Sequence, residues 1–553
     1  MNVPPLPARP LLGRDALLAD LADRLIAGQS PALSTAGMPG VGKTSLAVAL
    51  AHHRRVLEHF SDGVLWAGLG PQPDVVSIQA DWAAALGVDI SGIADLEARR
   101  RVLCNALGQR RALIIIDDAW DENVARRLRC GGRTTTLLTT RNDNIARGFA
   151  PAAFVSVPEL EQDPSEALLR SLAPEAWAAA PKEMRKLAQM TGGLPLALEV
   201  LGGYLGQAEH SAFPELIQQA LEALQDPGQW LALSGHRVGD AAEASLDAVI
   251  ALSVENVRRI HPAAARAFDA LGAFAPKPAR FSLEAAMAVT EADAATLARL
   301  IAHNLLAKDG DDLTLHQALA AAAAARCPAA ARQRHREYYL AQVREDKDDW
   351  QRIAQIYPQL SHAQAHLPPE DASHIEFVGA LSTYQTRRGL WVDRRRWLAQ
   401  ALATAHTTKD VIAQACMLNE YGYVYAALGE MPRALTYYNR ALKLVRQVGG
   451  RDGEAVTLNN IGHVYDALGE KQKALEYYNQ ALELYRQVGD RWGERITRFN
   501  MAVVFYALGE YDHAVAQLEI VVALDEAMGH PDLESDRAVL ARVRKKRVQS
   551  SGQ

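Results

Sequence analysis

The sequence has few cysteines, few aromatic residues and no long apolar run. No uncharged apolar stretch reaches the roughly 18 residues that cross a bilayer, and the opening MNVPPLPARPLLGRD lacks the basic and apolar parts of a signal peptide. Because its cysteines are scattered and form no CxxC pair, the sequence predicts neither a zinc site nor a disulfide framework. We therefore expect a soluble protein of a reducing cytoplasm. The cysteines are Cys104, Cys130, Cys327 and Cys416.

An excess of positive charge is also lacking. The 59 Lys and Arg residues are outnumbered by 65 Asp and Glu residues, for a net charge of −6, which is unlike a dedicated nucleic-acid binder. With 49% hydrophobic and 22% charged residues the composition is that of a folded protein. A length of 553 residues predicts about three to five domains rather than one core.

The C-terminal third repeats itself. The strings YGYVYAALGE, IGHVYDALGE and MAVVFYALGE begin 40 residues apart, at Tyr421, Ile461 and Met501. Small and large side chains recur at helical spacing on both sides of a shared glycine, which predicts a helical hairpin per copy. A fourth, degenerate copy precedes these three. The equivalent glycines are Gly389, Gly429, Gly469 and Gly509.

This pattern resembles tetratricopeptide (TPR) repeats, in a 40-residue variety. The resemblance implies an all-α superhelix whose concave side is lined by the first helix of each hairpin and binds a protein or peptide. The alternative is that these are ordinary solvated helix faces. The candidate partner-binding residues are Asn419, Tyr423, Asn459, His463 and Tyr506.

Apolar segments alternate with helical patterns in the N-terminal part, which predicts a parallel α/β sheet covered on both faces. The expected strands are 31–36, 63–67, 112–116, 134–140 and 153–157.

A glycine-rich loop follows the first expected strand. GMPGVGKT at 37–44 fits the P-loop pattern GxxxxGK[ST] and precedes the helical stretch SLAVALAHH. Such a loop turns backbone N–H groups toward the phosphates of ATP or ADP, its lysine reaches the terminal phosphates, and its threonine holds Mg²⁺. The alternative is a chance glycine loop. The predicted nucleotide-binding residues here are Gly37, Pro39, Gly40, Val41, Gly42, Lys43, Thr44 and Ser45.

Two further strand ends carry candidate catalytic residues. Asp117 and Asp118 follow four apolar residues in LIIIDDAWD, as in a Walker B site. We expect Asp117 to hold Mg²⁺ through water and Asp118 to act as general base, the alternative being that they only cap a helix. Arg141 ends the next strand, where it would sense the γ-phosphate or form a surface salt bridge.

Taken together, these motifs resemble the NB-ARC ATPases, the nucleotide switches of plant resistance proteins, animal apoptosis ATPases and bacterial STAND regulators. Beyond the P-loop, the resemblance rests on LLGRD at 11–15, LLTTR at 137–141 and GGLPLAL at 192–198. It implies that Leu12 and Arg14 lie near the adenine and that Pro195 packs against the base. Without the family, Pro195 simply begins a helix.

Residues 245–320 are similar to the winged-helix domain of that family and end in LTLHQ. The resemblance aligns His316 with a histidine that contacts the ADP β-phosphate, with Gln317 in place of an aspartate. A lone histidine in a helical pattern is otherwise ordinary structure.

The expected organisation is a P-loop domain (1–157), a small helical domain (158–238), a winged helix (239–328), a helical linker (329–375), four TPR units (376–545) and a basic, disordered tail (546–553). Only 11 residues precede Leu12, so the resemblance implies a separate effector protein or a nucleotide-dependent homo-oligomer.

These features predict a signalling switch that is closed with ADP and open with ATP, with slow ATPase activity. One alternative is a transcription regulator that binds DNA through the winged helix or the basic residues of the tail. Another is a constitutive metabolic NTPase or kinase. The basic residues in question are Arg542, Arg544, Lys545, Lys546 and Arg547.

Overall fold

The computed structural model describes residues 3–6, 9–34, 40–70, 73–90, 93, 95–206, 241–347 and 349–551. The chain divides into two compact units, Met1–His366 with Thr386–Leu390, and Leu367–Gln385 with Trp391–Gln553. We call them the P-loop unit and the repeat unit. Among the described residues, no helix combines the length and apolar character needed to span a membrane.

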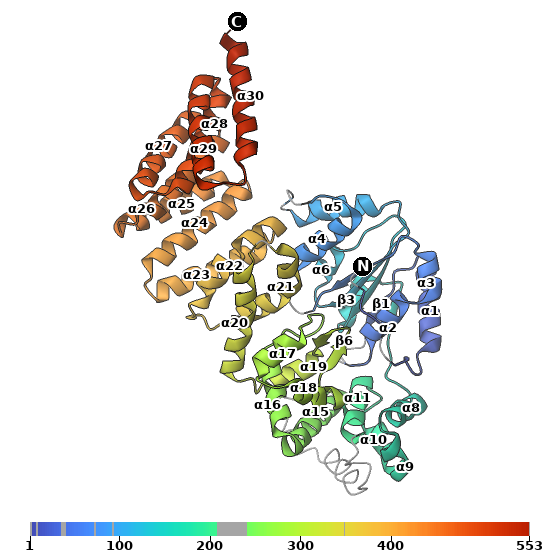
Figure 1. Cartoon of the computed structure of the whole chain (residues 1–553). Helices are drawn as coiled ribbons and strands as arrows, with labels where there is room; N and C mark the ends of the chain where they lie inside the picture. Colours follow the sequence, from blue (N-terminus) through green and yellow to red (C-terminus); the bar gives the residue numbers. More distant parts are fainter. Residues whose placement is uncertain are drawn as a thin grey trace. The chain divides into compact units, whose positions relative to one another are not determined.

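A five-stranded parallel sheet forms the centre of the P-loop unit (Figure 1). Its order is β2-β3-β4-β1-β5, so the strand that leads into the P-loop lies between β4 and β5. The side chains of β4 are buried throughout and those of β3 nearly so, as expected for strands covered on both faces. All five predicted strands are confirmed, except that positions 35–36 of the first lie outside the described residues. They are β1 (Ala32–Ser34), β2 (Val64–Gly68), β3 (Leu113–Ala119), β4 (Thr135–Thr140) and β5 (Phe154–Ser156).

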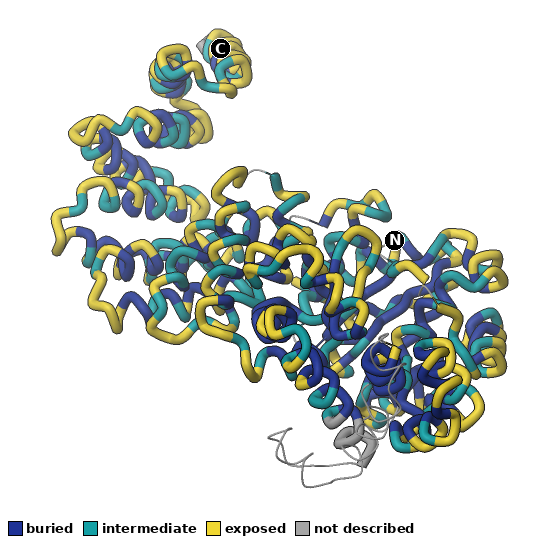
Figure 2. The backbone as a smooth tube through the Cα atoms, turned by 60° about the horizontal axis from the view of Figure 1, so that its bottom comes forward, coloured by how far each residue is buried: buried dark blue, intermediate teal, exposed yellow. Residues whose placement is uncertain are grey.

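Helices pack on this sheet and bury its aliphatic strands (Figure 2). Leu33 of β1 and Ile115 of β3 are fully buried. The helices are α1 (Asp15–Ile26), α2 (Lys43–Ala51), α3 (Arg54–His59), α4 (Val75–Leu86), α5 (Leu96–Leu107), α6 (Glu122–Arg126) and α7 (Asp143–Phe149).

The other described residues of the P-loop unit are mostly helical, as predicted, and include the small antiparallel hairpin β6–β7. The elements are α8 (Gln162–Leu172), α9 (Pro174–Ala179), α10 (Pro181–Met190), α11 (Pro195–Leu205), α15 (Ala241–Ile260), α16 (Pro262–Leu271), α17 (Leu283–Thr290), α18 (Ala294–Ala302), β6 (Ala307–Asp309), β7 (Asp312–Thr314), α19 (Gln317–Ala324), α20 (Ala329–Glu345) and α21 (Trp350–Ala365).

In the repeat unit, each predicted copy is a pair of helices. The second helix of a pair approaches the first at a glycine: a Cβ on Gly422 would lie 2.5 Å from the Tyr438 ring, and one on Gly462 would lie 2.8 Å from the Tyr478 ring. Glycine is required there because any side chain would separate the helices. The helices are α22 (Ser373–Arg388), α23 (Trp391–Thr407), α24 (Val411–Ala427), α25 (Met431–Gln447), α26 (Arg451–Ala467), α27 (Lys471–Val488), α28 (Arg491–Leu508), α29 (Tyr511–Met528) and α30 (Leu533–Ser551).

The expectation of a disordered tail is wrong for residues 546–551, which continue helix α30. This helix buries Leu540 and Val543 against α29. Its basic side chains are partly paired, because the Arg544 guanidinium lies 2.8 Å from the Glu519 carboxylate. Packing and charge pairing therefore extend the helix through the basic stretch.

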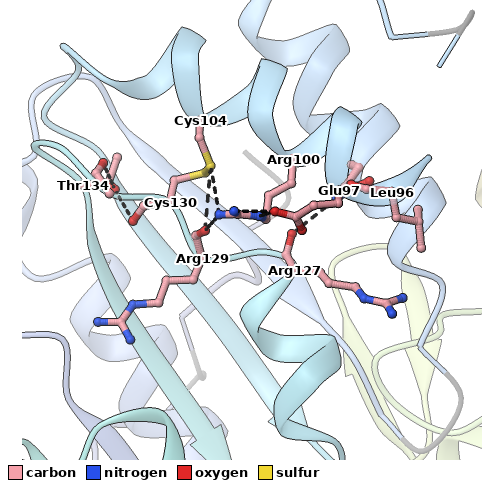
Figure 3. Close-up of a disulfide and its surroundings, with 10 residues drawn as sticks. Leu96, Glu97, Arg100, Cys104, Arg127, Arg129, Cys130 and Thr134 are labelled. Atoms are coloured by element: carbon pink, nitrogen blue, oxygen red, sulfur yellow. Dashed lines mark hydrogen bonds and ion pairs between the residues drawn. A yellow bond between two sulfur atoms is a disulfide. The ribbon is translucent and has the colours of Figure 1, made fainter. Parts of the chain in front are cut away.

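The prediction that no disulfide forms is also wrong. Cys104 of α5 and Cys130, in the segment before β4, are bonded to each other (Figure 3). Their Cα atoms lie 5.0 Å apart because α5 packs beside that segment. The adjacent Arg100 donates from Nη1 to the Cys104 sulfur at 3.8 Å.

Candidate functional site

The second half of the P-loop forms the tight turn that the motif predicts. Gly40 and Gly42 have φ of 83° and 96°, a region that favours glycine, and α2 begins at Lys43 directly after them. Among the described residues, the N-cap residue Gly42 makes no side-chain cap at this helix start, and backbone N–H groups of a helix's first turn, which here includes Ser45, favour an anion. Gly37 and Pro39 lie outside the described residues.

Lys43 is 8% exposed, so its ammonium group has lost most of its water. Burial, together with the nearby Arg141 charge, lowers the pKa of Lys43 to about 8. Asp117, Asp118 and Asp143 oppose this shift. A polyphosphate would supply the negative charge that this buried cation favours.

Next to the P-loop, Thr44 and Asp117 face each other across the ends of α2 and β3. The Thr44 hydroxyl donates to the Asp117 carboxylate at 3.0 Å, and the Thr139 hydroxyl of β4 donates to it at 2.6 Å. Burial raises the pKa of Asp117 to about 6, against the two hydroxyl hydrogen bonds that lower it. A hydroxyl and a carboxylate at this point form an oxygen donor set that suits Mg²⁺.

Asp118 and Arg141 meet at the same edge of the sheet. The Arg141 Nε donates to Asp118 Oδ1 at 3.3 Å, and the two side chains are 25% and 15% exposed. Asp118 has φ of 55°, and its backbone N–H donates to the Thr139 hydroxyl at 2.9 Å. Arg141 therefore forms a salt bridge, as one alternative expected, but with the candidate general base rather than at a remote surface.

Residues of the motifs at 11–15 and 192–198 form hydrogen bonds to the P-loop backbone. Arg14, 6% exposed, donates to the carbonyl oxygen of Pro158 at 2.6 Å and to that of Val41 at 3.3 Å. The Leu196 N–H donates to the Gly40 carbonyl at 3.2 Å.

Leu12 is partly exposed, and Pro195 is the first residue of α11, as the local interpretation expected. The adenine contacts of Leu12, Arg14 and Pro195 remain predictions.

His316 lies beside this site, at the N-terminus of α19. Its Nδ1 accepts from the Ala318 N–H at 3.2 Å, so the neutral ring carries its proton on Nε2 and can donate from there. Burial and the neighbouring cations Arg141 and Lys277 lower the pKa of His316 to about 3. The imidazole is therefore a neutral donor at physiological pH.

The sequence did not lead us to predict two residues of this site, Thr139 and Gln317. Thr139 was noted only as part of a strand, yet its hydroxyl donates to Asp117 and accepts from the Asp118 backbone. Gln317 was noted only as a departure from a motif, yet its amide contacts Asp118 and Arg141. For Thr139, the signal was the hydroxyl at the end of a buried strand. Nothing in the sequence indicated the contacts of Gln317.

The predicted partner surface of the repeats is at least partly exposed. Tyr423 is 42% and Tyr506 38% exposed, and His463 is also exposed. The asparagines instead join neighbouring first helices: Asn460 donates to the Asn419 side chain, and Asn500 donates to the Asn459 side chain, both at 3.3 Å.

Comparisons with known proteins agree with these motifs. Residues 14–177 match the NB-ARC domain model, and residues 413–487 match a tetratricopeptide repeat model. The chain is 30% identical over 294 residues to Regulatory protein AfsR of Streptomyces coelicolor, covering 50% of this chain and 28% of that protein. It is 29% identical over 212 residues to Probable disease resistance RPP8-like protein 2 of Arabidopsis thaliana, covering 36% of this chain and 23% of that protein.

The chain thus spans less than a third of the length of these two relatives. A solved structure from Pyrococcus horikoshii, a STAND protein with a tetratricopeptide repeat sensor, aligns with 97% of this chain and 87% of its own at 16% identity and a TM-score of 0.40. On the two family models, the chain carries an NB-ARC domain followed by C-terminal tetratricopeptide repeats.

Proposed function

We propose that the chain is a nucleotide-dependent signalling switch, closed with ADP and open with ATP. One observation supports this most: the segment after β7 reaches the P-loop site, where His316 and Gln317 lie beside charged groups of the sheet. In this proposal residues 239–328 act as a winged-helix domain that closes over the nucleotide. Turnover to ADP and phosphate is slow and resets the switch.

The described residues fit a magnesium nucleotide. The uncapped start of α2, the buried Lys43 ammonium and the neutral His316 Nε2–H are donors for phosphate oxygens. The Thr44 hydroxyl would hold Mg²⁺ directly, and the Asp117 carboxylate would hold it through a water molecule. When bound, the magnesium nucleotide supplies the terminal phosphoryl group that is lost in hydrolysis.

Each charged residue then has a separate task. Lys43 binds the terminal phosphates, and Asp118 accepts a proton from the attacking water. Arg141, at the end of β4, stabilises charge on the γ-phosphate. In the structure Asp118 and Arg141 contact each other, which is the arrangement of the closed form in this proposal.

Nucleotide shifts the switch only by its differential affinity for the two forms. Moving the equilibrium from 1:99 to 99:1 requires about 5.5 kcal/mol. A protein or peptide on the repeat surface would contribute part of that energy by favouring the open form. Effector output then comes from a separate protein or from a homo-oligomer of the open form.

The nucleotide proposal is tested by identifying the nucleotide retained by the purified protein. We expect ADP in a monomer, and conversion to an assembly after exchange for a non-hydrolysable ATP analogue with Mg²⁺, measured by light scattering on a sizing column. Equal affinity for ADP and ATP with no change in mass or shape would contradict it.

The repeat surface is tested by panning a random peptide library on phage against the full chain. Binders are expected to lose capture in Tyr423→Ala and His463→Ala and to keep it in Gln472→Ala and Gln480→Ala, exposed positions on the second helix α27. Unchanged capture by Tyr423→Ala and His463→Ala would contradict the prediction that this surface binds a peptide.

A further inference from the structure

A cleft of about 770 Å³ opens in the P-loop unit beside the disulfide, and Cys130 lines it whereas Cys104 does not. Small-molecule sites in proteins commonly have volumes of about 300–1,000 Å³. The described residues of the P-loop, with Asp117 and Asp118, lie outside the wall of this cleft, which is therefore separate from the candidate nucleotide site. A small molecule bound here would lie against one end of the disulfide.

Arginine predominates in the wall of this cleft. The two acidic residues of the wall are already engaged, because Glu97 pairs with Arg100 at 2.5 Å and Asp121 accepts from backbone N–H groups of α6 as its N-cap. In the described parts of the chain, no carboxylate pairs with Arg127 or Arg129. Uncompensated guanidinium groups attract an anion, and carboxylates match their planar fork. The arginines of the wall are Arg100, Arg126, Arg127 and Arg129.

The other sulfur of the disulfide lies next to a fixed cation. Arg100 Nη1 lies 3.8 Å from Cys104 Sγ (Figure 3). The Glu97 carboxylate, at 2.5 Å, and the Arg129 carbonyl, at 3.1 Å, hold the guanidinium in that place. A guanidinium beside a sulfur stabilises its thiolate form, and a stabilised thiolate is the better leaving group in thiol–disulfide exchange. The two ends of the bond therefore differ: Cys130 lines the cleft that can hold a nucleophile, and Cys104 is suited to leave.

We propose that this cleft is a thiol–disulfide exchange site for a low-molecular-weight thiol that carries carboxylate groups. The thiolate of this molecule attacks Cys130 Sγ, so that a new S–S bond forms there and the bond to Cys104 breaks. The electron pair leaves on Cys104 Sγ, beside Arg100, and that thiolate takes a proton from water. A second small thiol then attacks the sulfur of the first and releases Cys130. The protein gains two electrons, and the two small thiols become one disulfide.

The exchange acts on a strand of the candidate nucleotide site. The disulfide closes a loop that contains β3, and β3 carries Asp117 and Asp118. Reduction would thereby connect the thiol status of the surroundings to the support of these carboxylates. The exchange itself involves no nucleotide, so its test is separate from that of the proposed function.

The first test asks whether the arginines select the charge of the thiol. The full chain is reduced with glutathione, which has a net negative charge, or with neutral 2-mercaptoethanol. Alkylation and mass spectrometry then count the thiols of Cys104 and Cys130. Combining Arg127→Gln with Arg129→Gln should slow reduction by glutathione about fivefold, as expected for the loss of two partly exposed charge interactions, and leave the 2-mercaptoethanol rate unchanged.

The control is Arg54→Gln, at an arginine of α3 whose side chain is 89% exposed and lies outside this cleft. It should be reduced at the native rate by both thiols. In the native protein, added salt should slow glutathione more than 2-mercaptoethanol, because salt screens exposed charges. Equal slowing of both thiols in the double variant, or no slowing of either, would overturn the inference.

The second test locates the attacked sulfur. The native protein reacts briefly with glutathione in the presence of iodoacetamide, which alkylates the leaving thiolate and prevents its return. We expect peptides that carry glutathione on Cys130 and the alkyl group on Cys104. The reverse pattern would overturn the inference, as would free thiols at both cysteines in protein purified without reductant.

A third measurement isolates the leaving group. Arg100→Gln removes the cation beside Cys104, so reduction should slow about threefold or more with either thiol, and Arg100→Lys should restore most of the rate. The response to neutral 2-mercaptoethanol distinguishes this role from attraction of an anion. An unchanged 2-mercaptoethanol rate in Arg100→Gln would overturn the assignment of Cys104 as the sulfur that leaves.

Discussion

In the P-loop unit Gln317 reaches Asp118 across 199 residues, whereas in the repeats Asn460 reaches Asn419 across 41. The nucleotide site exists only when most of its unit is folded, because its groups come from the P-loop, two strand ends and α19. The repeat surface is supplied by adjacent helices that contact mainly their neighbours. Damage should therefore spread widely in the first unit and stay local in the second.

The largest effect is expected at the P-loop. Lys43→Ala removes the ammonium group proposed to bind the two terminal phosphates, and at 1.5–3 kcal/mol for each charge-assisted hydrogen bond we expect affinity for a non-hydrolysable ATP analogue to fall by about a thousandfold. Calorimetric titration with this analogue and Mg²⁺ measures the change. Lys471→Ala, which breaks a 2.5 Å ion pair with Asp466 in the repeats, is the control and should leave this affinity unchanged.

The second largest effect is expected from the disulfide, which closes a loop between residues 26 apart that includes all of β3. On the loop-entropy model, replacing Cys104 and Cys130 together by serine should destabilise the P-loop unit by about 3.5 kcal/mol. Hydrogen exchange should show faster opening of β3 and β4 and no change in α24–α29. Cys416→Ser, at an exposed thiol of α24, is the control. Equal protection of β3 with and without the disulfide would contradict this prediction.

The difference between long-range contacts in the P-loop unit and local contacts in the repeats also explains which parts of the structure the sequence predicted. Strands and repeats were predictable because their signals are local: β3 is a run of buried aliphatic residues, and each hairpin carries its own glycine and aromatic pattern. The P-loop was predictable because its glycines, lysine and threonine are contiguous in the sequence.

Contacts between distant segments were not predictable. The pairing of Cys104 with Cys130 depends on how α5 packs beside the segment before β4, and the contacts of Gln317 depend on how α19 approaches the sheet. No periodic pattern in the sequence indicates how α5 packs beside that segment or how α19 packs on the sheet. The tail from 546 was expected to be disordered because of its charge, but burial of Leu540 and Val543 earlier in α30 stabilises the helix that continues into it.

A smaller and local effect is expected in the repeats. In an exposed helix Gly→Ala gains about 1 kcal/mol, but in Gly422→Ala the new methyl would lie 2.5 Å from the Tyr438 ring, and overpacking costs about 1–3 kcal/mol. We expect a net loss of up to about 2 kcal/mol, seen as faster hydrogen exchange in α24 and α25 with unchanged ADP affinity. Gly379→Ala, on an open face of α22 with no atom within 4 Å, should be neutral or stabilising. Loss of ADP binding in Gly422→Ala would contradict the expectation that the effect of this change stays local to α24 and α25.

The smallest effect is a pH dependence that only the P-loop unit should show. Burial raises the pKa of Asp117 to about 6 and lowers that of Lys43 to about 8. Mg²⁺ needs the ionised carboxylate, so affinity for the magnesium nucleotide should fall below pH 6 by up to tenfold per unit.

Phosphate binding depends on the protonated Lys43 ammonium, so affinity for the magnesium nucleotide should also fall above pH 8. The pH profile of affinity is therefore expected to be bell-shaped. Titrations of ADP from pH 5 to 9, with and without Mg²⁺, measure both limbs. Asp117→Asn should remove the acid limb, and Lys43→Arg, which keeps its charge throughout this range, should remove the alkaline limb. If Asp117→Asn keeps the fall in affinity at acid pH, or Lys43→Arg keeps the fall at alkaline pH, that fall comes from the titration of another group of the site. The pH at which the fall occurs then gives the pKa of that group.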